Sequence, residues 1–256
     1  MWTFLGQNFL IDAKVRSYIA DKISALYKVC WCEALIEIWP GKGSITTLIS
    51  HISENFFVIE KDSTFIENWK LKIENWKFVL GDVLEVDVDK LLQEKKLNTK
   101  KTLVVGNLPY YITSPILRKF FWNGFQNYAG GIFMVQDEVA QKLKSDAKKK
   151  SYLRRLLNYA YTVTYLKWVP GKCFKPIPKV KSALIELKIK NWELKIERDK
   201  LIEFLELFAP FSRKTLGAIQ TMINKKSVCM FSIPESLKKK RLEELSWEDL
   251  TLILSL

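Results

Sequence analysis

Short runs of apolar residues recur along the first half of the chain, with helical patterns between them. From the N-terminus, the runs are ALIEI (34–38), FFVIE (56–60), KFVL (77–80), TLVVGN (102–107) and GIFMVQ (131–136). Runs of this length that alternate with helices are typical of a parallel sheet covered by helices on both faces. The pattern predicts a doubly wound α/β domain over residues 1–187.

The pattern changes after residue 187. The segments DKLIEFLELFAPF and RLEELSWEDLTLIL carry apolar residues at helical spacing, and Pro210 and Pro234 interrupt the region. We therefore expect a small helical domain over residues 188–256. A chain of 256 residues with 48% apolar content can bury the cores of one large and one small domain.

Composition narrows the class of protein further. No apolar run reaches the roughly 18 to 20 residues that cross a bilayer, and the start of the chain lacks the features of a signal peptide, which predicts a cytoplasmic protein without membrane contact. The four cysteines form no CxxC pair and His51 is the only histidine, so no metal site is expected.

The net charge of +13 is concentrated in one segment. Residues 138–181 hold 12 Lys and Arg against 2 acidic residues, whereas residues 1–137 hold 16 against 15. Within that segment, KLKSDAKKKSYLRRLL interleaves cations with Tyr152 and apolar residues, as phosphate-binding surfaces do. A polyanion-binding surface is the favoured interpretation, and a solvated charged face is the alternative.

Polar residues follow three of the expected strands. In open α/β sheets, ligands bind at the carboxyl ends of the strands. The loop EIWPGKG follows the first strand, and Glu60 ends the second, where a carboxylate can accept both hydroxyls of a ribose. Asp82 follows the third, where it can accept a hydrogen bond from an adenine amino group. Each signal is weak alone, but in this order they describe a nucleoside site.

The fourth strand ends in NLPYYITSP, residues 107–115, which is the most specific motif of the chain. An Asn-x-Pro-aromatic turn can direct the Asn107 side-chain oxygen and a backbone carbonyl at one exocyclic amine, while Tyr110 stacks on the base that carries it. Two such acceptors turn the amine lone pair toward an electrophile. The alternative is a proline turn with a core tyrosine.

These motifs together resemble a known family, the ribosomal RNA small-subunit adenine dimethyltransferases (the KsgA family). The matching stretches are LGQNFLID (5–12), EIWPGKGSIT (37–46), VIEKD (58–62), GDVLEVD (81–87), NLPYYITSPIL (107–117), FMVQDEVAQKL (133–143), VPGKCFKPIPKVKSALIEL (169–187) and FSRKTL (211–216). They cover almost the whole chain in family order. The resemblance implies a Rossmann-like methyltransferase domain followed by a small helical domain.

The resemblance also implies roles for individual residues. S-adenosylmethionine is the expected cofactor, and the residues expected to bind it are Asn8, Leu10, Trp39, Gly41, Glu60, Asp82 and Asn107. The target adenine is expected to contact the turn of Asn107, Pro109 and Tyr110, with Phe174 as a second stacking face. Since the donor is a sulfonium, catalysis depends on alignment and on exclusion of water, without a general base of shifted pKa.

The implied activity is transfer of two methyl groups to N6 of each of two adjacent adenines near the 3′ end of small-subunit rRNA. The expected partner is the immature small ribosomal subunit, bound by a monomer through Lys142, Lys144, Lys148, Lys149, Lys150, Arg154 and Arg155. One alternative is the related antibiotic-resistance methyltransferase of large-subunit rRNA, although LGQNFL and NLPYYITS favour the small-subunit group. Another is a non-catalytic RNA-binding assembly factor, which is expected if Trp39 is genuine.

Trp39 is the one departure from the family's cofactor loop, which has glycine at this position so that the backbone can approach the ligand. The chain has 10 glycines and 9 tryptophans, and Trp69, Trp76 and Trp192 follow asparagine where Asn-Gly is the expected turn dipeptide. Our hypothesis is that several tryptophans, Trp39 first, correspond to UGA codons that the source organism reads as glycine. The alternative is a true substitution with relaxed function.

Overall fold

A computed structural model describes residues 8–65, 77–122, 128–144, 152–190, 197–224 and 231–255. Contacts divide the chain into two compact units, made of the described residues within 1–146 and 157–190 and of those within 147–156 and 191–256. This division differs from a single break after residue 187, because residues 152–156 group with the C-terminal unit. Arg155 provides one reason, since its guanidinium donates to the carbonyls of Leu242 and Leu245.

The first unit is built on a seven-stranded sheet. Its strands, from one edge to the other, are β4 (Lys77–Leu80), β3 (Phe56–Glu60), β2 (Ala34–Ile38), β5 (Thr102–Asn107), β6 (Gly130–Gln136), β9 (Ser182–Ile189) and β7 (Tyr161–Val169). The first five are parallel, and β9 is antiparallel to both β6 and β7. All five strands expected from the apolar runs are confirmed, and the parallel order places their carboxyl ends at one edge of the sheet.

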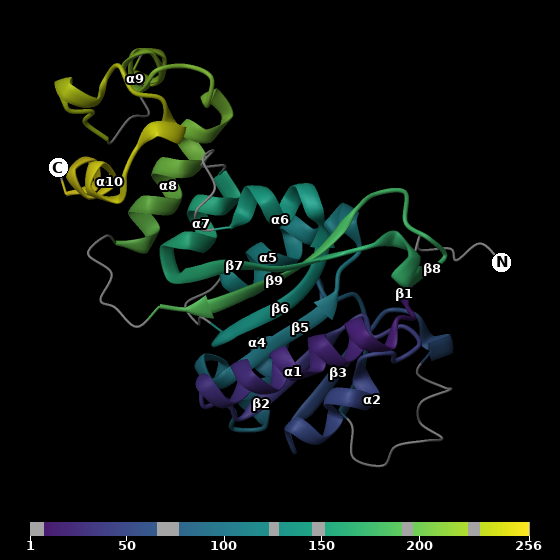
Figure 1. Ribbon diagram of the computed structural model, residues 1–256. Coiled ribbons are helices and arrows are strands. Elements are labelled where there is room, and N and C mark those ends of the chain that lie inside the picture. Colours follow the sequence, from purple (N-terminus) through teal and green to yellow (C-terminus); the bar gives the residue numbers. More distant parts are fainter. Residues whose placement is uncertain are drawn as a thin grey trace. The chain divides into compact units, whose positions relative to one another are not determined.

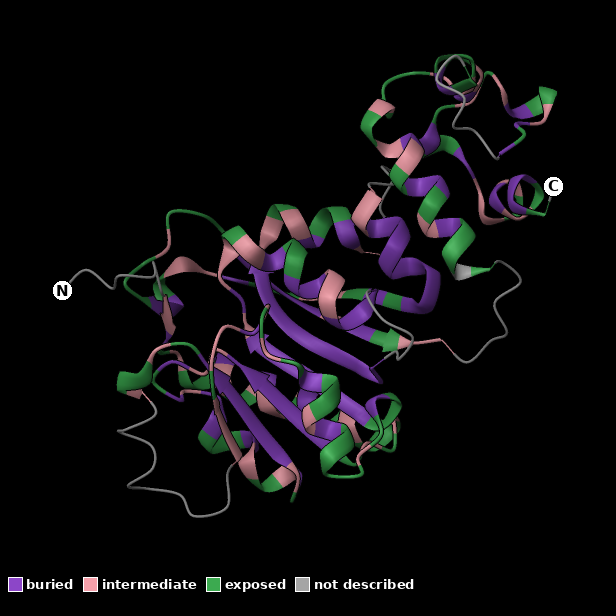
Figure 2. Ribbon diagram, turned by 180° about the vertical axis from the view of Figure 1, so that it is seen from behind, coloured by how far each residue is buried: buried purple, intermediate pink, exposed green. Residues whose placement is uncertain are grey.

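Helices cover both faces of this sheet (Figure 1). They are α1 (Ala13–Val29), α2 (Thr46–Ile49), α4 (Val88–Glu94), α5 (Thr113–Phe121), α6 (Asp137–Leu143) and the part of α7 (Tyr152–Ala160) from residue 157 onward, which belongs to this unit. Figure 2 shows the central strands buried along their length, as expected for parallel strands between two helical layers. A second, two-stranded sheet pairs β1 (Phe9–Leu10) antiparallel with β8 (Phe174–Lys175).

The last turn of α1 ends in a conformation that favours glycine. Trp31 N–H donates to the Lys28 carbonyl at 3.1 Å, and Cys32 N–H donates to the Tyr27 carbonyl at 3.0 Å. These are the two hydrogen bonds of a Schellman motif, in which the residue at the position of Trp31 is left-handed and most often glycine. Trp31 has a φ of +51° and is 83% exposed, so packing of its indole does not offset the cost of this conformation.

The second unit is helical. It contains α8 (Arg198–Phe208), α9 (Leu216–Asn224) and α10 (Trp247–Leu254). The apolar pattern over 241–254 forms α10 only from Trp247 onward, because Ser246 and Asp249 cap its N-terminus reciprocally. In the described part of the chain, no helix combines the length and the apolar character required to span a bilayer.

Candidate active site

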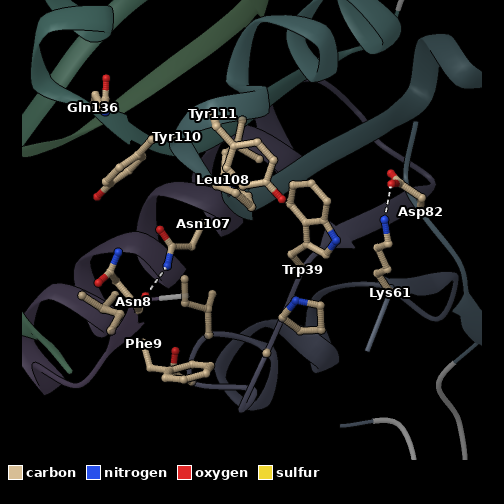
Figure 3. A pocket seen from close by; sticks show the side chains of 16 residues that line it. Asn8, Phe9, Trp39, Lys61, Asp82, Asn107, Leu108, Tyr110, Tyr111 and Gln136 are labelled. Atoms are coloured by element: carbon tan, nitrogen blue, oxygen red, sulfur yellow. Dashed lines mark hydrogen bonds and ion pairs between the residues drawn. The ribbon is translucent and has the colours of Figure 1, made fainter. Parts of the chain in front are cut away.

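A cavity of about 730 Å³ opens at the carboxyl edge of the parallel strands. This volume is in the range of small-molecule and cofactor sites. The residues expected from the sequence that line it are Asn8, Leu10, Trp39, Gly41, Asp82, Asn107, Pro109 and Tyr110. They come from β1 and the residue before it, from the segments that follow β2 and β4, and from the end of β5 and the turn after it, so the fold brings together positions that are far apart in the sequence (Figure 3).

The loop after β2 is held by a buried carboxylate. One Glu60 oxygen accepts the Gly41 N–H at 3.1 Å, and the other accepts the N–H groups of Lys61 and Asp62 at 2.9 and 3.0 Å. Burial raises the pKa of Glu60, although these backbone donors oppose the increase. Glu60 does not line the cavity; its carboxylate faces the loop backbone and fixes the shape of the cofactor loop.

A second buried carboxyl group lies behind this loop. Glu37 in β2 is 2% exposed, and its Oε2 has no hydrogen-bond partner among the described residues. Burial raises the pKa of Glu37 to about 8, with an opposing effect of the Thr46 hydroxyl and a further increase from Glu60. The group therefore carries a proton through most of the physiological pH range.

Asp82 lies on the cavity wall with Lys61. Their side chains form an ion pair of 2.9 Å (Figure 3), and the second Asp82 oxygen accepts the Leu84 N–H at 2.9 Å. Burial raises the pKa of Asp82, but the hydrogen bonds from Leu84 and Lys61 outweigh it, so the net pKa is lowered. Asp82 is therefore ionised and available as an acceptor for a ligand amino group.

Trp39 occupies the position where the loop turns toward the cavity. Its backbone N–H donates to the Ile59 carbonyl at 2.9 Å, and its φ is +52°, in the left-handed region. Gly41 and Gly43 have φ values of +54° and +74°, so every second residue of the loop is left-handed. Two of these three positions are glycine, the residue that adopts this conformation without strain. Figure 3 shows the Trp39 indole projecting into the cavity.

The turn after β5 forms the opposite wall. The Asn107 amide nitrogen donates to the Asn8 carbonyl at 3.0 Å, which leaves the side-chain oxygen of Asn107 free to accept from an amine (Figure 3). The Pro109 carbonyl accepts the Ile112 N–H at 3.2 Å and closes the turn. These contacts hold the Asn107 side chain and the turn that follows it in one conformation.

Tyr110 stands beside this acceptor with its ring orientation fixed. Its hydroxyl and that of Ser182 are 2.5 Å apart, so the Tyr110 side chain is tied to the first residue of β9. Burial raises the pKa of Tyr110, which keeps the phenol neutral. A neutral aromatic ring held in one orientation suits stacking on a base.

Phe174 is not on the cavity wall. The expected second stacking face is 1% exposed and packs in the main apolar core with Leu10 and Cys173. The pairing of β8 with β1, in which Phe174 lies opposite Leu10, accounts for this burial. The side chain therefore does not face a base in this structure.

Several of the lining residues were not predicted from the sequence as site residues. These are Phe9, Lys61, Leu108, Tyr111 and Gln136, among others. Lys61 and Gln136 could have been found, because each stands at the carboxyl end of a parallel strand, as Glu60 and Asp82 do. Tyr111 could not have been found in this way, because the Asn-x-Pro-aromatic motif assigns the stacking role to its neighbour Tyr110; its side chain is 71% exposed.

The segment expected to bind RNA is divided by the structure. Lys142 is exposed and Lys144 is half-buried, while Lys148, Lys149 and Lys150 lie outside the described residues. Arg154 and Arg155 are only 8% and 3% exposed. The Arg155 guanidinium donates to the carbonyls of Leu242 and Leu245 at 2.6 and 2.8 Å, and burial lowers its pKa to about 10. The assignment of these two arginines to RNA contacts is therefore wrong, because their side chains are buried.

The residues of the cavity fit a nucleoside cofactor in part. An ionised Asp82, the fixed Asn107 and a cavity of this volume provide polar groups and space for one. The Trp39 indole is the exception, since it projects into the cavity from a loop whose backbone is expected to approach the cofactor. Within the described ranges, no group of three or more His, Cys, Asp or Glu side chains could hold a metal ion.

Comparison with known proteins agrees with this arrangement. The model of the ribosomal RNA adenine dimethylase family matches residues 2–254. A ribosomal RNA small subunit methyltransferase A from Chlorobium phaeobacteroides is 35% identical over 250 residues, covering 96% of this chain and 87% of the relative. The corresponding protein from Clostridium perfringens is 32% identical over 247 residues, covering 94% of this chain and 81% of the relative.

Solved structures show the same fold. A dimethyladenosine transferase from Plasmodium falciparum has a TM-score of 0.72 at 20% identity, with 96% of each chain covered. The 23S rRNA methyltransferase ErmE has a TM-score of 0.67 at 20% identity, covering 97% of this chain and 100% of the other. At these identities the likeness concerns the fold alone, and it confirms the expected Rossmann-like methyltransferase architecture.

The fold and the cavity at its strand ends define a Rossmann-like methyltransferase with S-adenosylmethionine as the methyl donor. Within that class, the chain belongs to the ribosomal RNA adenine dimethylase family. The expected family, enzyme class and cofactor are thus confirmed.

Proposed function

We propose that this chain dimethylates N6 of two adjacent adenines near the 3′ end of small-subunit rRNA during assembly of the small ribosomal subunit. The observation that carries the proposal is the fixed turn of Asn107 and Tyr110 on the wall of the cavity that Asp82 also lines. The relatives named for the small subunit support this substrate over large-subunit rRNA.

The proposed mechanism depends on alignment of the amine. The Asn107 side-chain oxygen accepts a hydrogen bond from one N6–H of the adenine. Its amide nitrogen still donates to the Asn8 carbonyl, so the side chain does not rotate. Tyr110 stacks on the adenine and keeps the plane of the base fixed. Bound S-adenosylmethionine supplies an electrophilic methyl group. Positioning of two reactants in this way replaces a bimolecular step by an effectively unimolecular one.

Methyl transfer to purified immature small and large ribosomal subunits tests this proposal. Modification of adjacent adenines in the small subunit alone is the expected result, mapped on the rRNA by primer extension. Modification confined to the large subunit would contradict the choice of substrate while keeping the enzyme class.

We further propose that position 39 is glycine in the natural protein and that its codon is UGA. The left-handed φ of Trp39, the two glycines that share this conformation in the loop, and the projecting indole all support this proposal. Trp31, in the left-handed position of a Schellman motif, supports the same proposal for a second tryptophan. Reading the two codons is the test, and UGG at position 39 would contradict it.

A genuine Trp39 favours a second candidate function, a non-catalytic RNA-binding assembly factor. The observation behind it is again the indole in the cavity. Calorimetric titration with S-adenosylmethionine distinguishes the two candidates. Absence of binding even in the Trp39→Gly variant would favour the assembly factor.

The proposal also includes a monomeric chain that acts in the cytoplasm on rRNA. Lys142 and Lys144, which lie among the described residues, remain candidates for contact with RNA. Lys148, Lys149 and Lys150 lie outside the described residues and remain candidates from the sequence alone. Replacement of the last three by Ala is expected to reduce the salt dependence of RNA binding, by about 0.7 to 0.9 in log-log slope for each lost phosphate contact.

A further inference from the structure

A cationic loop connects β8 to β9, and both strands contact residues of the cavity wall. This rim loop, residues 175–181 with the sequence KPIPKVK, contains Lys175, Lys179 and Lys181 and no acidic residue. All three lysines are exposed, and none makes an ion pair with a described residue. Three like charges on seven residues repel one another, so the bare loop is electrostatically unfavourable and a polyanion would relieve it.

Both ends of the rim loop are tied to residues that line the cavity. At one end, Lys175 pairs with Phe9 and its neighbour Phe174 pairs with Leu10. At the other end, Ser182 bonds the hydroxyl of Tyr110 at 2.5 Å. The rim loop is therefore anchored at both ends to residues of the cavity wall, one of which is Tyr110 of the turn that carries Asn107.

One acidic residue is bonded to the loop without forming an ion pair with it. Asp137 N–H donates to the Lys181 carbonyl at 2.9 Å, its carboxylate accepts the Tyr165 hydroxyl at 2.7 Å, and among the described residues it makes no ion pair with a lysine of the rim loop. The loop also exposes apolar surface, since Ile177 is 68% and Val180 40% exposed. Cations interleaved with exposed apolar side chains are typical of surfaces that bind single-stranded nucleic acid.

We propose that the rim loop grips the phosphates flanking the target adenine, with Lys175, Lys179 and Lys181 as the contacting cations. This inference rests on the proposed function, because it takes rRNA as the polyanion. It differs from the sequence-based expectation in position, since the charge lies on the exposed loop between β8 and β9 and not at the buried Arg154 and Arg155.

The test compares two charge-matched triple variants in binding to immature small subunits across a salt series. The first replaces Lys175, Lys179 and Lys181 by Ala. The control replaces Lys90, Lys95 and Lys100 by Ala. These exposed lysines lie in α4 and in the segment that leads to the amino end of β5, whereas the cavity lies at the carboxyl ends of the strands. Each variant loses three positive charges, so net charge alone cannot distinguish them.

The rim variant is expected to bind more weakly at low salt, with a log-log salt slope smaller by about 2 to 3. The control variant is expected to keep the wild-type slope. Calorimetric binding of S-adenosylmethionine stays unchanged in both variants, which shows that the cavity is intact.

Equal weakening of both variants, or an unchanged slope in the rim variant, overturns the proposal. If the rim variant misfolds, the charge reversals Lys179→Glu and Lys181→Glu on exposed side chains carry the same test. Loss of binding to anionic phosphatidylglycerol vesicles without loss of binding to subunits would assign the loop to a membrane surface and also overturn it. Wild-type chain that binds subunits without methylating them refutes the proposed function but leaves the rim loop standing.

Discussion

The loop after β2 and the turn after β5 face the same cavity, but they differ in how well the backbone conformation suits the side chain that it carries. In the turn, Asn107 and Tyr110 are held by Asn8 and Ser182 in conformations suited to their side chains. In the loop, Trp39 is held by the Ile59 carbonyl in a left-handed conformation that favours glycine. The backbone of the loop therefore keeps the conformation of a glycine-containing binding loop even though Trp39 is strained in that conformation.

The largest effect is expected on the turn. Asn107→Ala removes the acceptor that aligns the amine, and we expect turnover to fall roughly 10²-fold or more while affinity for S-adenosylmethionine changes only a few-fold. Single-turnover kinetics and calorimetry measure the two quantities separately.

Asn55→Ala is the matched control. The Asn55 side-chain amide also donates to a backbone carbonyl, but Asn55 precedes the amino end of β3, away from the carboxyl ends where the cavity lies. Loss of cofactor affinity with intact turnover in Asn107→Ala would make Asn107 a cofactor residue alone.

On the loop, Trp39→Gly is expected to raise affinity for S-adenosylmethionine by up to about 10²-fold, since overpacking of a site costs 1–3 kcal/mol. It should also raise the melting temperature by roughly 2–8 °C, because the left-handed conformation costs a non-glycine residue about 1–2 kcal/mol.

Trp31→Gly separates these two effects. Trp31 shares the left-handed φ but does not line the cavity, so this variant should gain stability without any change in cofactor affinity. Equal gains in affinity for both variants would show that the indole of Trp39 does not obstruct the site.

Behind the loop, the protonated Glu37 makes stability depend on pH. Its pKa is about 8 in the folded chain against 4.5 for an ordinary Glu, so the folded state binds the extra proton and stability falls as pH rises from about 4.5 to 8. Glu37→Gln, an uncharged isostere, should remove this component and be more stable than wild type by roughly 1–3 kcal/mol at pH 8, with a smaller difference at pH 5. Urea denaturation at both pH values is the measurement, and a pH-independent difference would contradict the assignment.

The smallest effect is expected for Tyr110→Phe. The ring remains available for stacking, and only the hydrogen bond to Ser182 is lost, which is worth about 0.5–1.5 kcal/mol. Turnover should fall only a few-fold, with an unchanged KM for S-adenosylmethionine. A loss as large as that of Asn107→Ala would mean that the hydroxyl itself takes part in the reaction.

The sequence determined the strands and the edge at which the site lies. Burial on both faces requires continuous apolar runs, so β2, β3 and β5 could be bounded from local pattern alone. The polar residues at their carboxyl ends then had to meet, because parallel strands end together. Asp82 and Asn107 reached the cavity for this reason.

Only the tertiary structure decided which side chains face the cavity. Phe174 is buried because β8 pairs with β1, and Glu60 turns to the Gly41 N–H because the loop folds back over β3. Neither contact leaves a periodic signal, since its partners are distant in sequence. The same holds for Arg155, whose charge counted toward a basic segment but whose guanidinium binds carbonyls of the helical unit. Net charge is a property of the sequence, whereas exposed charge depends on which side chains the packing leaves in water.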